Sequence, residues 1–76
     1  MEEPTGGELK RIGKVIRAAR EGLKLSQETF AERADIDRTY VSRIERGEQN
    51  ISWESISRVA RALRVKPSVL LARAGL

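Results

Sequence analysis

The sequence predicts an all-α protein, a compact bundle of five short helices that form a single domain. Apolar residues recur at intervals of three and four along most of the chain, which is the spacing of one face of an α-helix. Residue types that begin and end helices stand between these stretches. The chain has only 76 residues, so it has room for one domain with a small core.

The first helix is expected from about Glu8 to Glu21, with Gly22 as its end. Residues 1–7 have no apolar periodicity and contain proline and glycine, so we expect a flexible N-terminal arm before a folded domain over residues 8–76. The residues spaced for the apolar face of this helix are Leu9, Ile12, Ile16, Ala19 and Leu23. The basic residues expected on its other faces are Lys10, Arg11, Lys14, Arg17 and Arg20.

Two further short helices are expected after this one, separated by a tight turn. Ser26 is expected to cap the second helix, which runs to about Ala34. Asp37 is expected to cap the third helix over residues 38–46, which Gly47 closes.

The last two helices are marked by a serine and a proline. Ser52 is expected to cap the fourth helix, with Ile51 before it as the start of a hydrophobic staple. Pro67 suits the first turn of a fifth helix that runs to about Arg73. The residues expected on the buried face of the fourth helix are Ile56, Val59, Ala60 and Leu63.

The second and third helices, joined by residues 35–37, have the arrangement of a helix-turn-helix. Such a unit needs a small residue where the helices cross, here Ala31, and a turn residue that tolerates a positive φ, here Asp35. The apolar residues expected to pack inward are Ile36, Val41 and Ile44. The hydrogen-bond donors on the opposite face are then Arg38, Thr39, Tyr40, Ser42, Arg43 and Arg46. Such donors suit the phosphates and base edges of DNA, and the alternative is a solvated basic face on an ordinary bundle.

The composition excludes several classes of function. The chain has no cysteine and no histidine, which removes disulfides, thiolate nucleophiles, histidine-based triads and the usual zinc ligand sets. We therefore expect no enzyme, no cofactor and no metal site. The formal net charge of +4 would attract a polyanion. Without an apolar run of about 20 residues or a signal-peptide pattern, we expect no membrane contact and a cytoplasmic location.

The stretch from Gln27-Glu28-Thr29-Phe30-Ala31 through Ile44-Glu45-Arg46-Gly47 resembles the phage-repressor-like (Cro/C1, or XRE) helix-turn-helix family, and the likeness extends from about Leu9 to Ala72. Together with Asn50-Ile51-Ser52, it most resembles the controller proteins of restriction-modification systems. This resemblance implies a lambda-repressor-like DNA-binding domain. It also implies a sequence-specific transcription regulator that acts as a homodimer on pseudo-palindromic double-stranded operators at its own promoter.

The resemblance also implies roles for individual residues. Gln27 would contact a phosphate at the start of the second helix, and Arg38 would read a base in the major groove, with Thr39 and Tyr40 in or beside that groove. The full set of expected DNA contacts is Gln27, Arg38, Thr39, Tyr40, Ser42, Arg43, Arg46, Gln49 and Asn50. Gln49 stands where many controller proteins have arginine, which removes one charged contact with DNA.

Apolar residues near the end of the chain exceed what a short terminal helix needs for its own packing. The resemblance implies that the fourth and fifth helices form a two-fold dimer interface, and the residues expected there are Ile51, Trp53, Val69, Leu70 and Leu71. The alternative is that the apolar residues of the fifth helix only close the core of the monomer.

Two other surfaces allow further interpretations. Glu28 and Glu32 share the outer face of the second helix, and similar acidic patches in phage-repressor-like activators contact the sigma subunit of RNA polymerase; the alternative is a solvated helix face. A different class of function, an antitoxin or other protein-interaction module of the XRE family, would instead use the apolar surface of the fifth helix.

Overall fold

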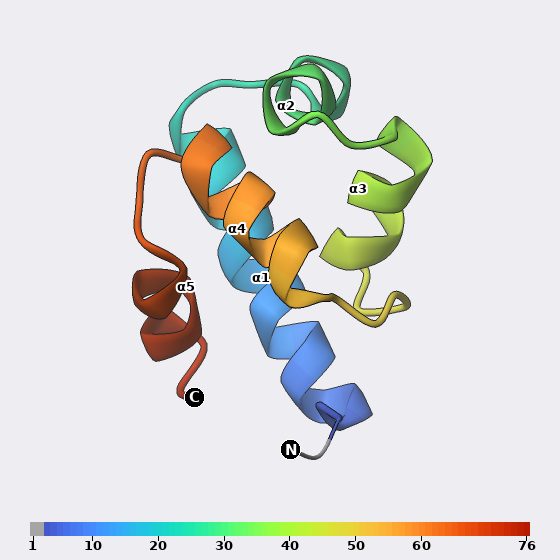
Figure 1. Ribbon diagram of the computed structural model, residues 1–76, viewed down its shortest axis with the longest axis vertical. Helices are drawn as coiled ribbons and strands as arrows, with labels where there is room; N and C mark the ends of the chain where they lie inside the picture. The colour runs from blue at the N-terminus through green and yellow to red at the C-terminus, as the bar shows by residue number, and fades with distance from the viewer. Residues whose placement is uncertain (1–2) are drawn as a thin grey trace.

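The computed structural model describes residues 3–76, and these residues form five helices and no strand (Figure 1). The helices are α1 (Gly6–Gly22), α2 (Gln27–Ala34), α3 (Arg38–Glu45), α4 (Trp53–Ala62) and α5 (Pro67–Arg73). Helix α1 packs against α3 and α5, α2 packs against α3 and α4, and α4 packs against α5. Figure 1 shows α3 and α5 on opposite sides of the bundle. The expected all-α architecture is confirmed.

Helix α1 begins at Gly6, earlier than expected, because Thr5 caps it. The Thr5 hydroxyl accepts a hydrogen bond from the Glu8 backbone N–H at 3.1 Å, and the Glu8 carboxylate accepts one from the Thr5 N–H at 2.8 Å. This reciprocal capping box makes residues 5–7 part of the folded domain rather than of the arm expected over residues 1–7. Of that arm, Met1 and Glu2 lie outside the described residues.

The helices around the turn begin at the expected residues because each start is fixed by a local side-chain cap. The Ser26 hydroxyl accepts from the Thr29 N–H at 3.0 Å, and the Asp37 carboxylate accepts from the Thr39 N–H at 2.7 Å. Asp35 adopts the left-handed conformation expected of the turn, with φ 55° and ψ 46°. The relative direction of α2 and α3 is therefore set by residues within the turn itself.

The end of α1 differs from the expectation. Gly22 is its last helical residue, and the left-handed residue after the helix is Lys24, with φ 58°. The expected position of Arg20 on a solvent-facing side of α1 is also wrong, because its side chain is buried against α3. Its charge is balanced there by a carboxylate, which sequence periodicity does not reveal.

The core lies between all five helices. Its largest fully buried side chains are Phe30, Ile16, Leu70, Val41 and Val59. The expected role of Leu70 in a dimer interface is wrong, because α5 lies against both α1 and α4 and leaves this side chain 0% exposed. For Leu70 the alternative applies: it closes the core of the monomer. No helix within residues 3–76 has the length and apolarity needed to cross a membrane.

Helix α1 approaches the end of α3 closely at Gly13. A Cβ atom added there would lie 2.4 Å from the carbonyl oxygen of Ile44 and 2.7 Å from that of Glu45. Because these are backbone atoms, no side-chain rotation could relieve the contact. The absence of a side chain at Gly13 therefore sets the spacing between α1 and α3.

Gly13→Ala should lower the free energy of unfolding by about 1–3 kcal/mol, because the added methyl group must displace the α3 backbone. Urea denaturation followed by circular dichroism measures the change. Gly22→Ala is the matched control in the same helix, since a Cβ there meets no atom within 4 Å. The control should leave stability unchanged or raise it by up to about 1 kcal/mol. Equal effects of the two substitutions would contradict the close contact between α1 and α3.

Candidate nucleic-acid interface

Helix α3 presents a polar face because its apolar residues are buried. Val41 and Ile44 are 1% and 3% exposed, and they pack toward α1 and α2. The exposed residues on the rest of the helix and at its end are Arg38, Thr39, Arg43 and Arg46, all expected from the sequence. These side chains form a continuous set of donors on the outside of the molecule.

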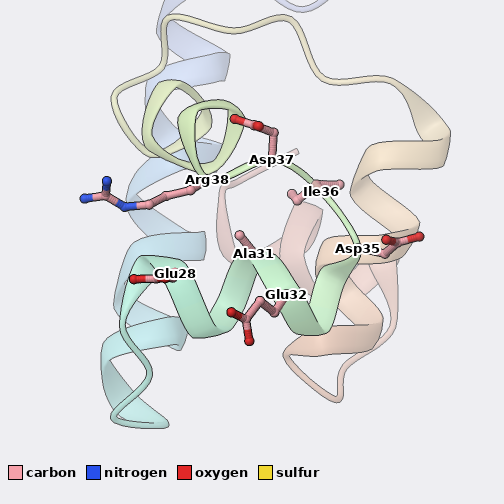
Figure 2. Close-up of a pocket in the computed structure, with 7 residues that line it drawn as sticks. All are labelled: Glu28, Ala31, Glu32, Asp35, Ile36, Asp37 and Arg38. Carbon is pink, nitrogen blue, oxygen red and sulfur yellow. The ribbon is translucent and has the colours of Figure 1, made fainter.

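The first two residues of α3, Arg38 and Thr39, are open to solvent. Figure 2 shows the Arg38 side chain extending away from the start of α3, toward the same side as Glu28 of α2. The side chain of Arg38 makes no hydrogen bond or ion pair with the other residues in the range 3–76. Its guanidinium group is available to a molecule that approaches α3.

Tyr40 and Arg46 tie α3 to the loop that follows it and to α4. Tyr40 is half-buried, and its hydroxyl donates to Ser55 Oγ at 3.0 Å and lies 3.3 Å from the carbonyl oxygen of Asn50. Arg46 donates to the hydroxyl of Ser42 and, at 3.1 Å, to the carboxylate of Glu48. The Tyr40 hydroxyl thus holds the loop in place, and its contact with DNA stays a prediction.

Gln49 and Asn50 lie in this loop, beside the end of α3. Gln49 Nε2 donates to the carbonyl oxygen of Asn50 at 3.3 Å, and the Asn50 side chain is exposed. The loop turns at Gly47, where φ is 72° and an added Cβ would lie 2.6 Å from Lys10 Cγ. The loop therefore packs closely against Lys10 of α1 at Gly47.

A buried hydrogen-bond network joins α1, α2 and α3 behind this face. Arg20 forms a two-point ion pair with Glu45, with Nε 2.7 Å from Oε2 and Nη2 3.0 Å from Oε1. Arg20 Nη1 also donates to the carbonyl oxygen of Leu25 at 2.7 Å. Gln27 Nε2 donates to Glu45 Oε1 at 3.0 Å. Hydrogen bonding to Glu45 raises the pKa of Arg20 despite the opposing effect of burial.

The pairing of Arg20 with Glu45 was not predicted, although the sequence contains a signal for it. Arg20 follows the buried Ile16 by four residues, and Glu45 follows the buried Val41 by four. Each charge therefore continues the apolar face of its own helix. Two opposite charges in such positions indicate a buried ion pair when the two faces meet.

The residues expected to form a dimer interface are only partly brought together. Ile51, Trp53 and Leu71 line one apolar groove, along with Ile12 and Leu76. Trp53 is 70% exposed, an unusual position for the largest apolar side chain of the protein. The expected Val69 is half-buried and lies outside the groove lining, and Leu70 is in the core.

The acidic residues of α2 lie on another face of the helix-turn-helix. Figure 2 shows Glu28, Glu32 and Asp35 around a shallow hollow between α2 and the turn. Glu28 and Glu32 are exposed and have no ion pair among residues 3–76. Asp35 is linked to α4 by Arg58, which donates to its carbonyl oxygen at 2.9 Å. Arg58 was not identified from the sequence, since its contact spans distant parts of the chain.

Comparison with known proteins places this geometry in a family. Residues 16–70 match the helix-turn-helix family. The chain is 42% identical over 64 residues to an HTH-type transcriptional regulator of Mycobacterium tuberculosis, across 84% of this chain and 46% of that protein. It therefore spans about half the length of that relative.

Two solved structures are similar over most of the chain. The restriction-modification controller protein C.AhdI from Aeromonas hydrophila superposes with a TM-score of 0.80 at 40% identity, over 82% of this chain and 94% of that one. The controller protein C.Esp1396I, solved as a tetramer in complex with its natural 35 base-pair operator, superposes with a TM-score of 0.80 at 30% identity, over 88% of each chain. The chain belongs to the helix-turn-helix family, and the relatives that it resembles include restriction-modification controller proteins.

Proposed function

We propose that this chain is a sequence-specific DNA-binding regulator of transcription that acts in the cytoplasm, without catalysis, on operators at its own promoter. The observation that carries the proposal is the outer face of α3, where Arg38, Thr39 and Arg43 lie exposed beside the start of α2. The similar protein C.Esp1396I, whose structure contains its natural operator, supports DNA as the ligand. Regulation of a restriction-modification system is the specific role that these relatives favour.

The chemistry of the face suits the major groove of DNA. The Arg38 guanidinium can donate two hydrogen bonds to O6 and N7 of a guanine, and the Thr39 methyl group can contact the methyl group of a thymine. Gln27 lies at the start of α2, where free backbone N–H groups favour a phosphate. Reading of bases and positioning by phosphates would therefore come from the starts of two adjacent helices.

Arg38→Ala should cost about 1–3 kcal/mol of binding to the preferred operator and relax the preference at one base pair in each half-site. Fluorescence anisotropy with an operator selected from random duplexes, and with a scrambled duplex, measures both effects. Arg73→Ala is the control, because it removes the same charge from α5 on the opposite side of the bundle (Figure 1). Equal losses on the two duplexes would show that Arg38 contacts only phosphate.

We propose that a second copy of this chain covers the apolar groove. The supporting observation is that Trp53 and Leu76 are 70% and 45% exposed at a groove that also contains Ile51 and Leu71. A two-fold dimer of this kind would carry two α3 helices, one from each copy. A pseudo-palindromic operator requires such recognition helices roughly 34 Å apart.

Trp53→Glu should give a folded monomer at concentrations where the unaltered chain is a dimer. Because Trp53 is exposed, the change should leave the helical circular dichroism intact, while loss of pairing should weaken operator binding about tenfold or more. Sedimentation equilibrium measures the mass. Leu23→Glu is the control, because Leu23 is another exposed apolar residue, at 45%, but lies outside the groove. An unchanged dimer mass for Trp53→Glu would place the interface elsewhere.

We further propose that Glu28 and Glu32 form a contact for the sigma subunit of RNA polymerase. Their support is that both carboxylates are exposed, free of ion pairs within residues 3–76, and next to the start of α3 (Figure 2). A protein bound there would sit beside any DNA held by Arg38. The two acidic residues would then attract a basic surface of the polymerase without touching the operator themselves.

The double substitution Glu28→Gln and Glu32→Gln should preserve operator binding and reduce activation of transcription by at least about fivefold, because it removes the coupling to polymerase. Transcription from the operator-containing promoter with purified polymerase measures activation. Glu21→Gln removes an exposed carboxylate from α1, where its ion pair with Arg17 is also exposed, and should leave activation intact. If the double substitution of Glu28 and Glu32 leaves activation unchanged, the two residues only form a solvated helix face.

An antitoxin or other protein-interaction module would give a different set of results. Its apolar groove would serve a different partner, so the isolated chain would remain monomeric and show no preferred duplex. A discrete dimer that selects one operator from random DNA would exclude that alternative.

A further inference from the structure

Gln27 extends the buried network behind α3 toward the protein surface. Glu45 and Arg20 have side chains only 3% and 11% exposed, and they lie between α1 and α3. Gln27 is half-buried and belongs to the first turn of α2, beside the outer face of α3. The network therefore connects the interior of the helix-turn-helix with the residue expected to contact a phosphate.

The carboxylate of Glu45 determines which end of the Gln27 amide faces inward. An ionised carboxylate only accepts hydrogen bonds, so the amide nitrogen must face it, as the 3.0 Å contact between Nε2 and Oε1 shows. The reverse orientation would place the amide oxygen against a negative charge. One N–H of Gln27 is thus committed to Glu45, and the second N–H on the same nitrogen is left over as a donor.

Arg20 makes this arrangement compatible with a DNA-binding surface. An unpaired carboxylate beneath the start of α2 would repel an approaching phosphate and would itself be costly to bury. Arg20 neutralises it through two hydrogen bonds and uses a third to hold the Leu25 carbonyl oxygen, just before α2. The Arg20 guanidinium thereby balances the charge of Glu45 and holds in place the carboxylate that Gln27 contacts.

We infer that Glu45, held by Arg20, is a positioning residue that orients the Gln27 amide so that its free N–H can bind a DNA phosphate. This inference rests on the proposed function and adds to it a pair of residues whose side chains are buried behind the candidate DNA face. Because phosphate is common to all sequences, the effect should be equal on operator and scrambled DNA. This equal effect distinguishes Glu45 from Arg38, whose substitution is expected to weaken binding to the operator more than binding to scrambled DNA.

The orientation of Gln27 can be tested first in the free protein, without DNA. In nitrogen-15 NMR spectra, the side-chain amide protons of Gln27 should be shifted from random-coil values and exchange slowly, because one of them is bound to a buried carboxylate. Gln49 is the control, since its amide reaches only the carbonyl oxygen of the next residue, at 3.3 Å. Gln27→Ala assigns the signal. A Gln27 amide as mobile and fast-exchanging as that of Gln49 would overturn the inference.

A double-mutant cycle then tests the effect on binding. Gln27→Ala removes the donor to the phosphate, and Glu45→Gln removes the carboxylate that fixes the orientation of that donor, so each should weaken binding about tenfold on both duplexes. In the Gln27→Ala background, Glu45→Gln should change affinity by less than about twofold, because the group that it positions is gone. If the fold-loss in affinity of the double variant equals the product of the two single losses, Glu45 acts only through general stability. The inference would then be wrong.

Two controls separate the possible failures. Val59→Ala lowers stability from within α4 without touching the network, so its effect on affinity should combine independently with that of Gln27→Ala. If Glu45→Gln does not fold at low temperature by circular dichroism, the NMR measurement on the unaltered chain decides. If the unaltered chain binds no duplex, the proposed function fails and the inference fails with it. If the unaltered chain binds normally but the two substitutions act independently, only the inference is rejected.

Discussion

The buried ion pair between Arg20 and Glu45 is the interaction on which the functional surface depends. Apolar burial drives the helices together, but it is not directional and does not fix the rotation of α3 about its axis. A two-point pair between a planar guanidinium and a carboxylate does fix geometry, because both hydrogen bonds must align. With Gly13 allowing the close approach of α1, the pair holds the end of α3 in one orientation. The outward direction of Arg38 and Thr39 follows from this constraint.

The polar residues of α3 divide into two groups by their contacts. Tyr40 and Arg46 are committed to hydrogen bonds with the loop and with neighbouring side chains. At its start, Arg38 and Thr39 are exposed, and the turn before them is held by Asp37 and by Arg58 of α4. In helix-turn-helix proteins the first residues of the recognition helix contact base edges. Tyr40 and Arg46 therefore anchor α3 to its surroundings. Arg38 and Thr39 are the residues suited to reading the base sequence.

Much of the fold could be predicted because helix ends are local. Ser26 and Asp37 mark the starts of α2 and α3 by bonds within three residues, and Asp35 forms the turn through its own backbone. The errors concern distant contacts. Periodicity alone assigned Arg20 to solvent, although Glu45 meets it from 25 residues away, and it left Leu70 available for a partner. The candidate DNA face was foreseen as a set of residue types, whereas the network behind it required knowing which helices meet.

The exposure of Trp53 has a practical consequence. It is the only tryptophan of the sequence, so it accounts for the indole emission of the whole protein. At 70% exposure, an indole emits at the long wavelengths of a hydrated ring, and covering the groove would shift its emission to shorter wavelengths. Unfolding of an isolated chain would change that signal little. The intrinsic fluorescence therefore reports on what occupies the groove rather than on whether the chain is folded.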